Sequence, residues 1–348
     1  MKKFITLSML FMATALFAQE EEKPALTISG SVDAYYRANF TAPNDENAIA
    51  PGSSFANLPG FALGMANVIM AYEGEKVGFV ADLVFGPRGA DAVFNSPQLG
   101  GFYRSSNIIN QLYAYWNVSE SVTLTMGNFN TFLGYEVISP TANFNYSTSY
   151  LFSYGPFSHT GLKADFALSE DFSLALMLMN PTDVTEFNPS GDYHYGAQLG
   201  YSGQYLNFLG YSNAFQIDYT GGYEVSDPFY LGLNLSYADL DGPSFYGVAL
   251  YPQIATSDSF SIGLRAEYFA ETDGGAGAIA NGGGPVAYDT NGDGNVFEFT
   301  LTGSYVIENL TIKPELRLDS ASENAFIDND LAGTKSLSSF VLAAIYSF

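Results

Sequence analysis

The residues with the clearest chemical potential are charges that alternate with apolar residues. In KPELRLD, residues 313–319, every second side chain is charged, although charged residues make up only 14% of the chain. Alternate residues of a β-strand point to opposite faces, so these charges share one face of a predicted strand. Opposed acids and bases on such a face could bind ions and orient hydrated solutes. Polar faces of other predicted strands extend the set to Asp33, Arg37, Asp82, Lys163, Asp165, Asp218, Arg265, Glu267, Glu298, Lys313, Glu315, Arg317 and Asp319.

Residues that commonly carry catalysis are scarce. The chain has no cysteine and two histidines, His159 and His194, neither of which lies in a nucleophile motif. The sequence therefore predicts no enzyme activity and no cofactor. Acidic residues number 36 against 12 basic ones, which argues against nucleic-acid binding because phosphate contacts need clustered Lys and Arg.

One loop has the spacing of a calcium site. In DTNGDGNVFEFT, residues 289–300, Gly294 stands at the turn position of such a loop, but Thr300 replaces the bidentate Glu. A turn rich in Gly, Asn and Asp that only reverses the chain is the alternative. The candidate calcium ligands are Asp289, Asn291, Asp293 and Asn295.

The N-terminus reads as an export signal. Residues 1–18 combine two lysines, an apolar run and the small residue Ala18, which together predict a cleaved signal peptide. An uncleaved anchor is the alternative, but the apolar run is short for a membrane span. Residues 19–348 are then the mature, exported domain.

Period-two alternation recurs along the mature chain and predicts an all-β fold. In residues 260–269 and 310–319, apolar and polar side chains take turns as strand residues do. We expect about sixteen strands, with 14 to 18 compatible with the pattern. The predicted strands are 25–40, 61–73, 77–86, 110–118, 121–129, 159–168, 171–180, 193–202, 204–212, 214–225, 228–239, 244–256, 258–271, 296–306, 309–319 and 338–348.

Such alternation fits either a soluble sandwich or a transmembrane barrel, and three features favour the barrel. Aromatic residues such as Phe229 and Tyr237 end the apolar faces, as the interfacial girdles of membrane barrels require. Short predicted connections alternate with long ones. The chain ends on an alternating strand with Phe348, which resembles the C-terminal signature that the barrel-assembly machinery recognises. We predict a single antiparallel barrel in the outer membrane of a Gram-negative-type cell, with short periplasmic turns and long outer loops.

A barrel of this size is too wide to fill with its own wall side chains, so an aqueous pore is expected. The charged set would then line the pore; the alternative is that these charges form salt bridges that only stiffen the wall. Residues 127–158 are long, aromatic and nearly uncharged, and we expect them to fold inward as a constriction loop. An additional wall strand over 145–154 is the alternative. The candidate constriction residues are Tyr135, Glu136, Asn145 and Tyr146.

Several segments resemble the OmpL-like outer-membrane β-barrel porins. The resemblance spans essentially the whole mature chain, and it implies a porin without an established substrate. It rests on SGSVDAYYRANF (29–40), GNFNTFLGYE (127–136), NYSTSYLFSYGPFSHTGLKADF (145–166), LRAEYF (264–269) and KPELRLD (313–319).

Together these features predict a porin that passes small hydrophilic solutes or ions with a mild cation preference. Its expected partners are outer-membrane lipid, the assembly machinery, the solutes and other copies of the chain. The main alternative is a non-channel structural or adhesive barrel with a plugged lumen. A soluble secreted β-protein and an outer-membrane lipase rank lower.

Overall fold

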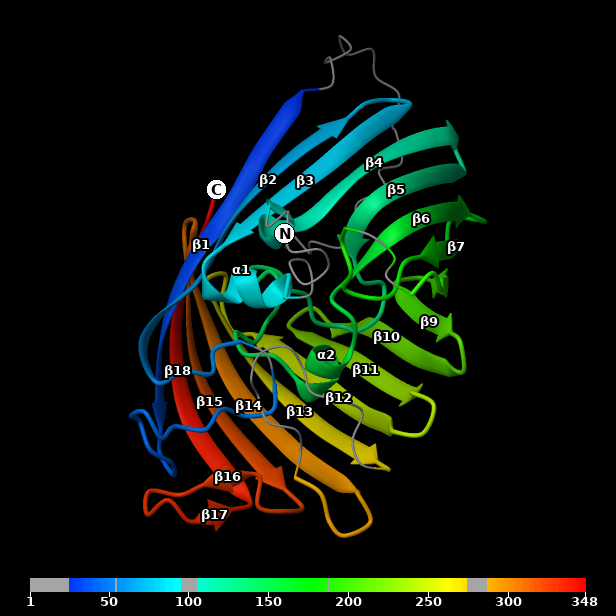
Figure 1. Cartoon of the computed structure of the whole chain (residues 1–348). Coiled ribbons are helices and arrows are strands. Elements are labelled where there is room, and N and C mark those ends of the chain that lie inside the picture. Colours follow the sequence, from blue (N-terminus) through cyan, green and yellow to red (C-terminus); the bar gives the residue numbers. More distant parts are fainter. Residues whose placement is uncertain (1–24, 54, 95–104, 187, 189, 274–286) are drawn as a thin grey trace.

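The fold is a closed antiparallel barrel (Figure 1). The computed structural model describes residues 25–53, 55–94, 105–186, 188, 190–273 and 287–348, so the predicted signal peptide lies outside the described residues. Within these ranges, sixteen strands make the wall: β1 (Leu26–Asn39), β2 (Gly60–Glu73), β3 (Val77–Phe85), β4 (Ile109–Ser119), β5 (Val122–Asn130), β6 (Ser158–Ala167), β7 (Phe172–Met179), β8 (His194–Tyr201), β9 (Gln204–Tyr211), β10 (Ala214–Ser226), β11 (Phe229–Asp239), β12 (Ser244–Ala255), β13 (Phe260–Thr272), β14 (Gly294–Ile307), β15 (Leu310–Ala321) and β18 (Ser336–Ser347).

The remaining elements are short and lie in the connections. A small hairpin of β16 and β17 sits between β15 and β18, and α1 and α2 lie within the outline of the barrel in Figure 1. Among the described residues, no helix is long and apolar enough to cross a membrane. The bounds of these elements are α1 (Pro87–Ala92), η1 (Ser105–Ile108), α2 (Tyr150–Tyr154), β16 (Phe326–Ile327) and β17 (Gly333–Thr334).

The barrel closes where the first and last strands meet. β1 pairs with both β2 and β18, with Val32 opposite Tyr346 at the seam. The prediction of about sixteen strands is confirmed, and each predicted boundary lies within two residues of the observed one. The interpretation of 145–154 as a wall strand is wrong, because α2 occupies its second half.

The wall has an apolar outer face and a polar inner face. Leu316 and Leu318 are 49% and 44% exposed, whereas Arg317 between them is 2% exposed. Since the barrel is closed, the exposed leucines face outward, where lipid surrounds a membrane barrel. The alternating charges of KPELRLD therefore all point into the barrel.

Short and long connections lie at opposite ends of the barrel, as the sequence predicts. At one end, the strands are joined by short turns such as 120–121 and 308–309. At the other end, most connections are long, including 40–59, 131–157 and 322–335. Outer-membrane barrels have short periplasmic turns and long outer loops, so the long connections mark the outer end.

The connection 131–157, called the inward loop here, folds into the barrel. Its side chains Ile138, Phe152 and Phe157 are buried in one apolar cluster with Phe55 and Val84. Residues from the inward loop, from the connection 40–59, from the connection after β3 and from the wall thus share a core inside the barrel. The sequence-based range 127–158 includes residues at both ends that belong to β5 and β6.

Candidate functional site

The inward loop lies against the wall with its backbone bound by charged side chains. The Glu315 carboxylate on β15 accepts the N–H groups of Tyr146 at 2.9 Å and Ser147 at 3.3 Å. The Glu267 carboxylate on β13 accepts those of Tyr150 at 2.8 Å and Leu151 at 2.7 Å. A buried backbone N–H without a partner is costly, so these carboxylates do for the loop what a neighbouring strand would do in a sheet.

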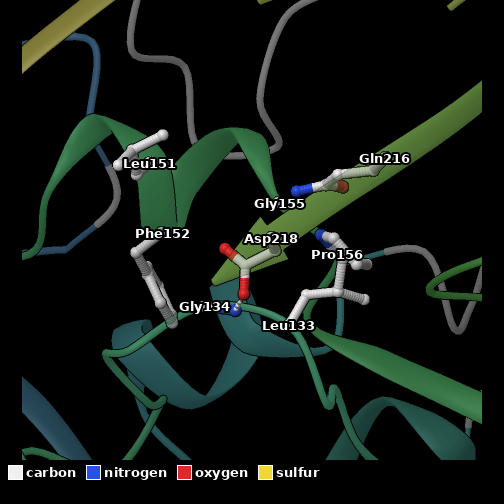
Figure 2. A pocket seen from close by; sticks show the side chains of 8 residues that line it. All are labelled: Leu133, Gly134, Leu151, Phe152, Gly155, Pro156, Gln216 and Asp218. Atoms are coloured by element: carbon white, nitrogen blue, oxygen red, sulfur yellow. Dashed lines mark hydrogen bonds between the residues drawn. The ribbon is translucent and has the colours of Figure 1, made fainter. Parts of the chain in front are cut away.

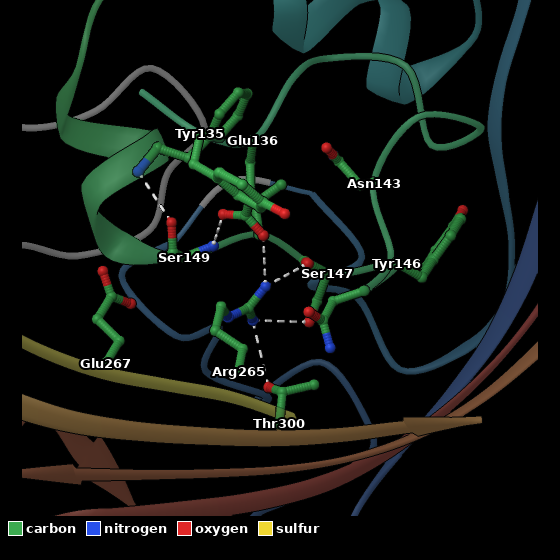
Figure 3. A network of polar contacts seen from close by, with 12 residues as sticks. Tyr135, Glu136, Asn143, Tyr146, Ser147, Ser149, Arg265, Glu267 and Thr300 are labelled. Atoms are coloured by element: carbon green, nitrogen blue, oxygen red, sulfur yellow. Dashed lines mark hydrogen bonds and ion pairs between the residues drawn. The ribbon is translucent and has the colours of Figure 1, made fainter. Parts of the chain in front are cut away.

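Arg265 on β13 also joins the wall to the inward loop, acting as a hydrogen-bond donor to loop acceptors. Its guanidinium donates to the Ser147 carbonyl at 2.6 Å and pairs with the carboxylates of Glu298 and Glu136 at 2.8 Å each. Figure 3 shows Arg265 reaching from the wall to Ser147 and Glu136 of the loop. Arg265 is completely buried, so its ion pair with Glu136 is shielded from water.

Two further cations hold the carbonyl groups of the same loop. Arg317 donates to the Thr148 carbonyl at 2.9 Å and pairs with Asp319 at 2.8 Å. The Lys313 ammonium donates to the carbonyl of Asn143. Acceptors and donors therefore both line the wall where the loop passes, and the loop's own N–H and C=O groups meet them.

Arg88 on α1 ties a second connection to the inward loop. Its guanidinium donates to the carbonyls of Ile138 at 2.9 Å and Tyr146 at 3.0 Å. It also stacks over the Phe55 ring, 4.3 Å from the ring centre. Since Arg88 is 3% exposed, it links residues from three connections inside the barrel.

Two loop tyrosines reach wall carboxylates. The Tyr146 hydroxyl donates to Asp33 at 2.5 Å, and the Tyr150 hydroxyl donates to Asp319 at 3.0 Å. Burial, and then the neighbouring carboxylate, raise the pKa of both tyrosines well above the ordinary value. Both hydroxyls therefore keep their protons at neutral pH and act as donors.

Replacing Tyr146 with Phe should lower the free energy of unfolding by about 1.5–3 kcal/mol, because the Asp33 carboxylate loses a buried donor. Urea unfolding in detergent micelles measures the change. Tyr195→Phe is the control, since Tyr195 is 58% exposed on the outer face of β8. Equal stability of the two variants would contradict this role for the Tyr146 hydroxyl.

Glycines of the inner wall form sockets for the loop side chains. A Cβ atom at Gly232 would lie 2.4 Å from the Tyr135 ring, and one at Gly263 would lie 2.4 Å from the Phe144 ring. Real Cβ contacts are not this short, so larger residues at these positions would push the loop away. These glycines are not among the site residues that we predicted from the sequence. Their position on the inward-facing side of predicted strands is the sequence feature that could have indicated them. The same relation holds between Gly196 and Phe132, at 2.8 Å.

Three further inward charges of the predicted set, Arg37, Asp82 and Asp218, bind partners away from the Arg265 ion pairs. Arg37 donates to the Ala56 carbonyl at 3.0 Å, and Asp82 accepts from Asn110 at 2.6 Å. Asp218 accepts from the Gly134 N–H at 3.0 Å, beside a narrow pocket between the inward loop and β10 (Figure 2).

Lys163 and Asp165 differ from the rest of the predicted set. They pair with one another at 3.1 Å on β6, with side chains 27% and 39% exposed. The other eleven predicted residues are buried, and eight of them bind the inward loop directly: Asp33, Asp218, Arg265, Glu267, Lys313, Glu315, Arg317 and Asp319.

The predicted calcium loop is organised by its own backbone. The Asp289 carboxylate accepts the N–H groups of Asn291 at 2.7 Å and Asp293 at 3.1 Å, and these bonds hold the pKa of Asp289 below its ordinary value. The Asn295 N–H donates to the Ser322 hydroxyl. In the described residues, no group of three or more His, Cys, Asp or Glu is placed to hold a metal ion. Calcium binding stays a prediction.

Comparison with known proteins agrees with the closed barrel and its polar interior. The family described as "Putative beta-barrel porin-2, OmpL-like" matches residues 25–348. The chain belongs to this porin family. No curated protein matches the chain. The match places this OmpL-like porin in the outer membrane, as the sequence predicts.

Solved outer-membrane barrels share the fold of this OmpL-like porin at low sequence identity. The outer membrane channel DcaP of Acinetobacter baumannii is 13% identical with a TM-score of 0.56, covering 95% of this chain and 99% of that one. OmpT of Vibrio cholerae, in a trimer form, is 10% identical with a TM-score of 0.58, covering 94% and 100%. OmpF of Salmonella typhi in complex with daunomycin is 11% identical with a TM-score of 0.58, covering 95% and 99%.

Proposed function

We propose that this porin is a passive channel for small hydrophilic solutes or ions, with a mild cation preference and no enzymatic activity. One observation carries the proposal: Lys163 and Asp165 face the barrel interior and are still partly exposed. Lys163 and Asp165 lie four and two residues from the end of β6, so water enters the barrel interior from the end with the short turns. The inward loop would then narrow this path, with Tyr135, Glu136, Asn145 and Tyr146 in the constriction.

A second candidate is a non-channel barrel whose lumen is plugged. Apolar packing inside the barrel favours it, because Leu133 of the inward loop is buried against Met177, Met179 and Leu209 of the wall. Planar-bilayer recordings with a panel of solutes separate the two functions. Stepwise currents are expected for the channel, whereas a correctly folded barrel that never conducts would establish the plug.

The cation preference should depend on the exposed ion pair. Asp165→Asn leaves Lys163 unpaired and should lower the cation-to-anion permeability ratio, whereas Lys163→Ala should raise it. In water, a unit charge changes the energy of an ion 4 Å away by about 1 kcal/mol, with opposite signs for a cation and an anion, so each ratio should change by at most roughly thirtyfold. Reversal potentials across a KCl gradient measure the ratio. Shifts in the same direction for both variants would contradict the proposal.

A further inference from the structure

We propose that a strip of charges on the inner wall is a recognition site for a bent polypeptide segment that enters a helical turn, occupied here by the chain's own segment 145–151. The charged strip consists of Arg265, Glu267, Glu315 and Arg317. The inference rests on the proposed channel function, and it names peptides as the solute class that the channel would prefer.

Each residue of the charged strip binds at least one peptide group of the segment, and Arg265 and Arg317 also pair with wall carboxylates. Glu315 and Glu267 each accept two consecutive backbone N–H groups, at 2.7–3.3 Å. Arg265 and Arg317 donate to the carbonyls of Ser147 and Thr148 at 2.6 and 2.9 Å. Every peptide offers the same N–H and C=O groups, so these contacts do not require the side chains of this segment.

The spacing of these contacts sets the length of peptide that fits. The two carboxylates bind the N–H pairs of residues 146–147 and 150–151, and the guanidiniums bind the carbonyls between them. A stretch of about six residues therefore fills the charged strip. Hydroxyl side chains add to the fit, because Tyr146 and Tyr150 donate to Asp33 and Asp319 beyond the strip.

The charged strip needs a partner of this kind whenever the loop is absent. Its four residues are at most 2% exposed in this structure, and removal of the segment would leave their bonds to the loop unmade. A peptide restores both the acceptors and the donors at once. An inorganic ion satisfies charges of one sign only, so the mixed strip favours a peptide over an ion.

The test uses the full mature chain with residues 144–152 replaced by nine alternating Gly and Ser residues. The probe is a fluorescent, end-capped peptide with the sequence of 145–151, NYSTSYL. Fluorescence anisotropy in detergent micelles should show binding that weakens by at least about tenfold when the peptide N–H groups matching Tyr146, Ser147, Tyr150 and Leu151 are methylated. Glu267→Gln and Glu315→Gln, introduced together into the chain with the Gly–Ser replacement, should weaken binding of the unmethylated peptide by a similar factor.

Asp165→Asn is the matched control, because its carboxylate lies outside the charged strip and pairs with Lys163. Equal binding of methylated and unmethylated peptides, or unchanged binding after Glu267→Gln and Glu315→Gln, would overturn the inference. Should the replaced chain not fold, Tyr146→Ala with Tyr150→Ala removes the hydroxyl bonds of the segment to Asp33 and Asp319, so that the free peptide can displace the segment in the same titration. Bilayer current is recorded separately: peptide binding without current rejects the channel, and current without peptide binding rejects the strip.

Discussion

Replacing Arg265 with Ala should release the inward loop and lower the free energy of unfolding by about 3–5 kcal/mol, the usual cost of breaking a buried ion pair from one side. The substitution leaves the carboxylates of Glu136 and Glu298 buried without their cation. It also removes the donor to the Ser147 carbonyl. Urea unfolding in micelles measures the stability, and single-channel current should increase because the loop no longer narrows the path.

Lys163→Ala is the matched control for this experiment. Its ion pair with Asp165 is partly exposed, and pairs of that kind contribute only about 0–1 kcal/mol. The control should therefore unfold almost as the unaltered chain does. A loss of stability as large as that of Arg265→Ala would show that charge removal itself, rather than loop release, causes the effect.

The double variant Gly232→Ala with Gly263→Ala should expel the inward loop sterically. Each new Cβ would lie 2.4 Å from a loop ring, Tyr135 in one case and Phe144 in the other. Overpacking of this kind costs about 1–3 kcal/mol at each site, and either the loop or the wall must move. Because the rings belong to the loop and the glycines to hydrogen-bonded strands, we expect the loop to move. Larger single-channel currents and increased proteolysis within 131–157 are the measurements.

Gly303→Ala provides the control for the glycine sockets. Gly303 lies on the lipid-facing side of β14, where a Cβ would approach the Phe260 ring to 3.3 Å, a contact that small shifts relieve. This variant should keep the current and the protease resistance of the unaltered chain. If the double variant matched Gly303→Ala in both measurements, the glycine sockets would not position the loop.

Local signals in the sequence are enough to predict the architecture of the barrel. Period-two alternation gives the strands and their two faces, and the lengths of the connections give the two ends of the barrel. Each signal is contained within about a dozen residues, so strand boundaries came out within two residues of the observed ones. The direction of the KPELRLD charges, into the barrel, also follows from alternation alone.

The partners of those charges depend on contacts between segments that lie far apart in the chain. Glu315 binds Tyr146, which is 169 positions away in the chain, and no local pattern specifies which loop will lie over which strand. Most of the predicted charges are covered by the inward loop, whereas Lys163 and Asp165 remain exposed. Strand glycines that look unremarkable in the sequence become sockets once the barrel closes and brings the loop against them. Closure is the physical reason, since it fixes distances across the lumen that depend on all the strands together.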